Sequence, residues 1–131
     1  MKELKLQVEI LAQEELKRSM VKFPLFNSTH EAISVIREEF EETADELMYA
    51  ESEINEIWHH VKKNNLKCQI QHIESLQIDA TNMAAEAIQL AAMASKFLES
   101  FKDEWKTSYR IQKSRRIKFP FKLYLFNSRR A

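Results

Sequence analysis

Apolar residues recur at seven-residue intervals through the middle of the chain. They lie at Ile33, Phe40, Leu47, Ile54 and Val61, with companions at Ile36, Ala50 and Ile57. A repeat sustained over this length predicts one helix of about 30 residues that packs against other helices along this apolar seam. The run KKNN at 62–65 interrupts the pattern and predicts the end of the helix.

The segment before this helix predicts a shorter helix and a connection that contains proline. Its apolar positions are Leu4, Val8, Leu11 and Met20. Their spacing predicts an amphipathic helix over residues 2–20. This helix should end before Pro24, because proline disfavours the helical conformation of the residue before it. Ser28 followed by Glu31 has the spacing of a capping box and predicts the start of the long helix.

A third helical pattern starts at about Gln69 and passes through an alanine-rich segment. One line along it is formed by Leu76, Met83, Leu90 and Phe97, and the next by Ile73, Ala80, Ala87 and Ala94. The small alanine side chains should let a neighbouring helix approach closely. From Lys96 to Arg116 the pattern remains helical, so the third helix either continues or bends into a fourth.

Composition supports an all-α fold, a bundle of long helices. The 131 residues include no glycine, two prolines and one cysteine. Tight turns and nearly all β architectures use glycine, so its absence indicates long helices joined by a few loops. Glycine-rich phosphate-binding loops are excluded. The single Cys68 excludes an internal disulfide and a cysteine-cluster zinc site. No segment approaches the roughly 18 apolar residues of a membrane span, so we expect a soluble, cytoplasmic protein with no membrane partner.

The zero net charge hides a division of the chain into two parts. Residues 1–105 hold all 20 acidic residues and 11 of the 20 basic ones, a net charge of −9, and are expected to form one helical domain. Residues 106–131 hold nine basic residues and no acidic one, with aromatic residues between them. This basic tail could bind nucleic acid through phosphate contacts and stacking. It could equally bind the acidic body of its own or a neighbouring subunit.

The carboxylates near the start of the long helix fall on two flanks of the apolar seam. At about 100° per residue, Glu39, Glu42 and Glu46 lie on one flank, which also contains apolar residues. Glu38, Glu41 and Asp45 lie on the other flank, which is uniformly polar. The first flank is therefore the one that should turn towards a neighbouring helix.

A matching flank on the third helix contains polar residues within the segment NMAAEAIQLAAMA. These residues are Asp79, Asn82, Glu86 and Gln89. If the two flanks face each other, Glu39, Glu42, Glu86 and Asp79 surround one point. Carboxylates without histidine or cysteine suit Mg²⁺, with Mn²⁺ as the alternative, and Mg²⁺ held in this way commonly binds substrate phosphates. The competing interpretation is a solvated face, because ExxE pairs are common on charged helices.

Two segments in this order resemble a known family. KFPLFNSTHEAISVIREEFEE at 22–42, followed by AAEAIQLAAMASKF at 84–97, is similar to the phage and prophage branch of the MazG-like, all-α nucleoside triphosphate pyrophosphohydrolases. The resemblance covers roughly residues 10–100. It implies a helical bundle, a homodimer or homotetramer in a bacterial host, that cleaves a nucleotide substrate (NTP or dNTP) into a monophosphate and pyrophosphate.

The resemblance also implies roles for particular residues. An ExxE pair on one helix and an ExxD pair on the next hold the metal in that family. Glu39 and Glu42 match the first pair and Glu86 begins the second, but Gln89 stands where the aspartate is expected, and Asp79 could compensate. Glu38 or Glu46 would assist the attacking water as a catalytic residue. Lys96, His30 and Asn82 are candidates for substrate binding, although a solvated lysine is the alternative for Lys96.

A competing hypothesis is a catalytically inactive, oligomeric phage protein that binds a host protein or nucleic acid through its basic tail. Gln89 and the division of charge motivate it. His59, His60 and His72 lie near the connection between the second and third helices, and we expect them at the surface without a ligand role.

Overall fold

The computed structural model describes the backbone of residues 1–114 and the side chains of residues 1–108. These residues form three α-helices, α1 (Lys2–Lys22), α2 (Thr29–Lys62) and α3 (Leu66–Ser114), and no strand. The predicted all-α fold is therefore confirmed for this part of the chain. Contacts divide the chain into two units, Met1–Ser100 and Phe101–Ala131. Most of the predicted basic tail lies outside the described residues.

The connection between α1 and α2 follows from its sequence. Phe23, the residue before Pro24, has the extended backbone (φ −135°, ψ 122°) that a following proline favours, and α1 ends there. Ser28 caps α2, with its hydroxyl accepting a hydrogen bond from the Glu31 backbone N–H at 3.1 Å. The Glu31 carboxylate accepts from the backbone N–H of Asn27 at 2.9 Å. The predicted capping box is therefore present with one difference, because the Glu31 carboxylate binds the backbone N–H of Asn27, one residue before the N-cap Ser28.

The connection between α2 and α3 is short and uses asparagine for two purposes. Asn64 has a left-handed backbone (φ 52°), a conformation that asparagine tolerates better than most residues. The Asn65 side chain accepts from the Cys68 backbone N–H at 3.3 Å and so caps α3. This cap explains why α3 begins at Leu66, earlier than the predicted Gln69. The helix then continues through Lys96 to Ser114, without a fourth helix.

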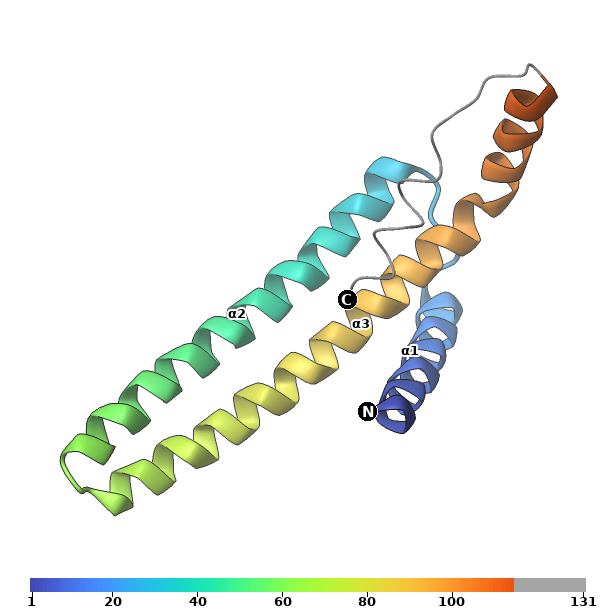
Figure 1. The fold of residues 1–131 in the computed structure, drawn as a ribbon. Coiled ribbons are helices and arrows are strands. Elements are labelled where there is room, and N and C mark those ends of the chain that lie inside the picture. Colours follow the sequence, from blue (N-terminus) through green and yellow to red (C-terminus); the bar gives the residue numbers. More distant parts are fainter. Residues whose placement is uncertain (115–131) are drawn as a thin grey trace. The chain divides into compact units, whose positions relative to one another are not determined.

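Helices α2 and α3 run side by side in opposite directions and form a hairpin (Figure 1). Apart from Val35, the partly or fully buried positions of α2 recur at alternating spacings of three and four residues: Ala32, Ile36, Glu39, Thr43, Glu46, Ala50, Glu53, Ile57 and His60. We call these nine positions the inner strip of α2. Five of them are polar, so the strip that faces the rest of the chain is small and polar in much of its length.

The predicted packing of the apolar seam is correct for its companions and wrong for its main line. The companions Ile36, Ala50 and Ile57 are partly or fully buried and belong to the inner strip. Ile33, Phe40, Leu47, Ile54 and Val61 are 39–59% exposed. The line that runs through Ile33 and Phe40 lies about one residue step, roughly 100°, around the helix from the centre of the inner strip. A seven-residue repeat identifies an apolar strip but does not specify which neighbour covers it. Within this chain α3 packs against the adjacent strip and leaves the seam at the surface.

On α3 the sequence prediction is correct for one line and wrong for the other. Leu76, Met83, Leu90 and Phe97 are all half-buried, as predicted. Ile73, Ala80, Ala87 and Ala94 are exposed, so the alanines do not serve close packing within the chain. Although large apolar side chains lie at the surface, none of the helices in the described part of the chain is long and apolar enough to span a membrane.

Candidate metal centre and its cavity

Three carboxylates from α2 and α3 meet inside the first unit. Glu39 and Glu42 are one helical turn apart on α2, and Glu86 approaches them from α3. Each contributes an oxygen to a group in which these atoms lie within 4.8 Å of one another. The convergence predicted from helical angles is thus present, and we call Glu39, Glu42 and Glu86 the acidic cluster. The binding of a metal ion there stays a prediction.

The acidic cluster lacks a compensating positive charge among the described residues. None of the ion pairs given for residues 1–108 involves Glu39, Glu42 or Glu86. One oxygen each of Glu39, Glu46 and Glu86 is buried without a hydrogen-bond partner in the same part of the chain. Buried carboxylate oxygens without partners are costly, and a cation or protons among these side chains would lower that cost.

The pKa values reflect this crowding. Burial raises the pKa of Glu39 above its ordinary value of 4.5, and the charges of Glu42 and Glu86 raise it further. Burial also raises the pKa of Glu86, followed by the charge of Glu42, a hydrogen bond with Glu42 and the charge of Glu46. Like charges held together disfavour ionisation, and a cation placed among them reverses that effect.

A cavity of about 750 Å³ lies beside the acidic cluster. Its wall combines α1, the connection to α2, the first turns of α2 and one segment of α3. The charged lining residues are Glu15, Arg18, Lys22, Glu31, Glu38, Glu39 and Lys96. Helix α2 contributes only acidic groups to this charged lining, whereas α1 contributes Arg18 and Lys22 together with Glu15.

Lys96 is a structural part of the cavity wall. Its side chain is 3% exposed, and Nζ donates to the Phe23 carbonyl at 3.1 Å. The same Nζ lies 4.9 Å from the centre of the Phe26 ring. Ser100 adds a second link, because its hydroxyl accepts from the Phe26 backbone N–H at 3.0 Å. The interpretation of Lys96 as a solvated lysine is wrong, since α3 uses it to hold the α1–α2 connection.

The other predicted site residues lie at different distances from the acidic cluster. Glu46 is half-buried and close enough for its charge to affect Glu86, whereas Glu38 is exposed and lines the cavity. Gln89 also lines the cavity. Asp79 is half-buried on α3 but does not belong to the group within 4.8 Å. His30 and Asn82 are exposed and are not among the residues that line the cavity.

Sequence reasoning missed the basic residues that α1 contributes. Arg18 and Lys22 are four residues apart on α1, so they share one face of it, and both line the cavity. Arg18 forms an ion pair with Glu15 at 3.2 Å. The only signal in the sequence is this spacing just before Pro24, and it does not reveal that α1 folds back to the acidic cluster.

The acidic cluster fits the ion that the sequence suggested. Its donor atoms are all carboxylate oxygens, two of its members have a buried oxygen without a partner, and a cavity provides room for further ligands. These are the preferences of a hard divalent cation such as Mg²⁺. Glu39, Glu42 and Glu86 would hold the ion.

Comparisons of the chain with protein-family models, with curated proteins and with solved structures find no match. The function therefore has to be argued from the geometry of the site.

Proposed function

We propose that this protein is a Mg²⁺-dependent nucleotide pyrophosphohydrolase that converts an NTP or dNTP into a nucleoside monophosphate and pyrophosphate. The observation that supports the proposal most directly is the acidic cluster next to a cavity lined by Arg18 and Lys22. Carboxylates for a cation and basic side chains for phosphate oxygens thus lie around one open cavity, with Glu39 as the member shared with the acidic cluster. The resemblance of residues 22–42 and 84–97 to the MazG-like family points to the same chemistry.

Each group has a definite task in this proposal. The bound Mg²⁺ would neutralise charge on the phosphates and increase the acidity of a water ligand. Arg18 and Lys22 would bind the phosphate chain. Phe23, 61% exposed on the cavity wall, offers a flat apolar surface to the base. A water oxygen bonds to one phosphorus of the α–β anhydride, and the bridging P–O bond breaks to release pyrophosphate.

Glu46 is the better candidate for the group that accepts the proton of the water. It has a buried oxygen without a hydrogen-bond partner among the described residues, and it lies beside Glu86. A general base is most effective when its basic atom is oriented and is not already engaged by another group. Glu38 is exposed, so its carboxylate has no comparable constraint.

The experiment is an assay of pyrophosphate release by the purified full chain with a panel of canonical and modified NTPs and dNTPs, with and without Mg²⁺. Glu39→Gln should lower kcat/KM by at least about 100-fold, the upper end of the loss for residues that merely support a metal ligand. Glu41→Gln is the matched control, because Glu41 is exposed on the same helix and carries the same charge. No release by the wild type, or equal losses in the two variants, would refute the assignment.

A second candidate function is supported by the exposed apolar seam of α2. We propose that a second copy of the chain covers this seam, which makes the protein a homodimer or homotetramer. Burial of Phe40 and its neighbours would stabilise the oligomer by about 25 cal/mol for each Å² of apolar area removed from water.

An oligomer without activity, which binds a host protein or nucleic acid through residues 106–131, remains the alternative to the enzyme, and Gln89 in the cavity wall favours it.

The seam can be tested by light scattering after size-exclusion chromatography. Phe40→Glu should shift the wild-type oligomer towards monomer, because it places a charge within the apolar contact. Tyr49→Glu is the control, because Tyr49 is an exposed aromatic residue of the same helix on the side opposite Phe40. A wild-type protein that is monomeric at all concentrations would contradict self-association. Loss of nucleic-acid binding on deletion of residues 106–131, with no pyrophosphate release, would favour the inactive binding protein.

A further inference from the structure

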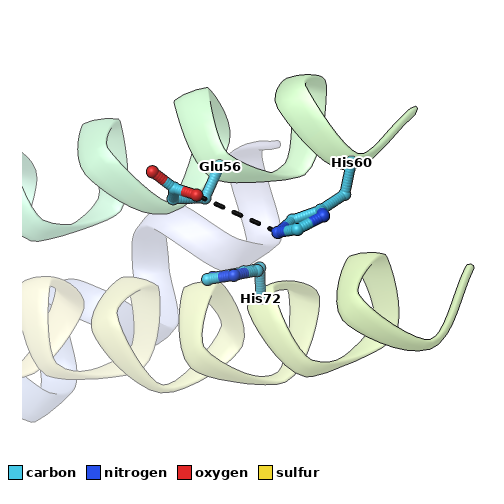
Figure 2. Close-up of side chains that lie close together, drawn as sticks. All are labelled: Glu56, His60 and His72. Carbon is cyan, nitrogen blue, oxygen red and sulfur yellow. Dashed lines mark ion pairs between the residues drawn. The ribbon is translucent and has the colours of Figure 1, made fainter. Parts of the chain in front are cut away.

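A second group of titratable side chains lies at the opposite end of the α2–α3 hairpin, near the connection at residues 63–65. Figure 2 shows Glu56 and His60 extending from α2 and His72 extending towards them from α3. Each of the three offers a ligand atom, and these atoms lie within 4.8 Å of one another. Glu56 and His60 are four residues apart and therefore share one face of α2. We call Glu56, His60 and His72 the histidine cluster.

The hydrogen bonds around the histidine cluster leave imidazole nitrogens available. His72 Nδ1 lies 2.6 Å from a Glu53 carboxylate oxygen. In the neutral ring, a carboxylate that accepts from Nδ1 leaves the lone pair on Nε2, the nitrogen that a metal ion binds. His60 Nδ1 is buried without a hydrogen-bond partner among the described residues, and His60 Nε2 lies 4.0 Å from Glu56. Both histidine rings thus have a nitrogen that no strong contact occupies.

We propose that Glu56, His60 and His72 bind Zn²⁺, with Glu53 as the carboxylate that orients His72. Two imidazole nitrogens and one carboxylate oxygen are a typical three-residue zinc set, with the fourth position left to water or another ligand. The pair Glu53–His72 has the arrangement in which a carboxylate accepts from the second nitrogen of a metal-binding histidine. Nitrogen ligands separate this site from the acidic cluster, whose oxygen-only donors prefer Mg²⁺.

Binding requires a defined rearrangement. The rings of His60 and His72 are nearly parallel, with centroids 5.4 Å apart and planes inclined by 17°. An ion lies in the plane of each imidazole that binds it, so one ring has to turn out of this stack. His72 is held by Glu53, so His60 is the ring that turns. The side chains of His60 and His72 are 18% and 29% exposed, which leaves room for the ion to enter.

An ion in the histidine cluster joins α2 to α3 close to their connection. In the described structure this end of the hairpin is already linked by a hydrogen bond from Gln69 Nε2 to the His60 carbonyl at 3.2 Å. Zinc would add bonds between the side chains of the two helices at the same level. Because the ligands come from both helices, they are assembled only in the folded chain, so binding would also stabilise the fold.

The proposal is tested with the full chain after treatment with a chelator. Zn²⁺ affinity is measured by competition with a chromophoric chelator, and circular dichroism verifies folding of each variant. We expect one zinc site in the wild type, an affinity at least about 100-fold weaker in His60→Gln and His72→Gln, and a loss of about 10–100-fold in Glu53→Gln. His59→Gln is the matched control, because His59 is adjacent in sequence but exposed and outside the cluster.

Three results would overturn the proposal: no zinc binding by the wild type, an equal loss of affinity in His59→Gln and His60→Gln, or loss of the site in Glu39→Gln instead. Co²⁺ provides a measurement that does not depend on the folding of variants. Intense visible absorption from the wild type with Co²⁺ is expected for a tetrahedral site with nitrogen ligands. The weak absorption of octahedral Co²⁺ would contradict the assigned ligand set.

Discussion

The two ends of the α2–α3 hairpin use the same pair of helices to assemble different ligand atoms. Near the start of α2, the acidic cluster contains only carboxylate oxygens and borders a cavity with basic residues from α1. Near the end of α2, the histidine cluster combines imidazole nitrogens with a carboxylate, and a further carboxylate orients His72. The two clusters therefore differ in the side-chain atoms that they bring together, while the same two helices supply the backbone at both.

The inner strip of α2 places polar side chains at several levels of the hairpin. Glu39, Glu46, Glu53 and His60 recur every seven residues along it, so each faces α3 at a different level. Both helices determine the chemistry at each level: Glu86 of α3 lies opposite the first pair, whereas His60 of α2 and His72 of α3 bring two imidazoles together at the last level. A polar repeat of this kind lets one hairpin hold two separate clusters of titratable side chains on the same pair of helices.

The largest expected effect distinguishes the two candidates for the proposed general base beside the acidic cluster, Glu46 and Glu38. Glu46→Gln should lower kcat by about 10²–10⁴-fold, the usual contribution of a positioned base, and should leave zinc affinity at the other end unchanged. Glu38→Gln has the same charge change at an exposed position and should cost much less. Steady-state assays of pyrophosphate release measure both. A larger loss in Glu38→Gln would assign the base to Glu38.

A smaller effect tests whether Lys96 stabilises the fold by holding the α1–α2 connection against α3. Lys96→Met should lower the free energy of unfolding by about 1.5–3 kcal/mol, because it removes a charged hydrogen bond and leaves the Phe23 carbonyl without that donor. Urea denaturation followed by circular dichroism measures this change. Lys17→Met, at an exposed position of α1, should change stability by less than about 0.5 kcal/mol. Equal effects would contradict the structural role of Lys96.

The smallest effect concerns the pH dependence of the acidic end. The raised pKa of Glu86 means that the folded state binds its proton more tightly than the unfolded state does. Above the raised pKa the ionised group therefore destabilises the fold, and this penalty disappears as the pH falls through that pKa towards 4.5. Glu86→Gln should raise the Tm of the metal-free protein at pH 7 and should flatten its rise on acidification.

The control for this prediction is Glu74→Gln, an exposed position on α3, which should change neither the Tm at pH 7 nor its slope with pH. Mg²⁺ should reverse the order of the two proteins, because it stabilises the wild type but not Glu86→Gln. A lower Tm for metal-free Glu86→Gln would show that Glu86 stabilises the fold by a contact other than those described.

Local signals account for what the sequence predicted correctly. Pro24 ends α1, Ser28 starts α2, and the run at 62–65 separates α2 from α3, because each acts on the backbone within a few residues. Helical angles also placed Glu39 and Glu42 on the flank that meets Glu86. The histidine cluster was missed because Glu56 and His60 form only half of it, and nothing local relates them to His72.

The sequence by itself thus determined the break between α1 and α2, the end of α2, and which side chains share each helical face, because these follow from backbone preferences and a fixed rotation per residue. Only the tertiary structure decided which face turns inward. It buried Lys96 by bringing the distant Phe23 carbonyl to its ammonium group, and it placed Arg18 and Lys22 beside the acidic cluster. It also left the apolar seam exposed, because α3 contacts a neighbouring strip of α2. Such choices depend on contacts between residues far apart in the chain, and no local pattern encodes them.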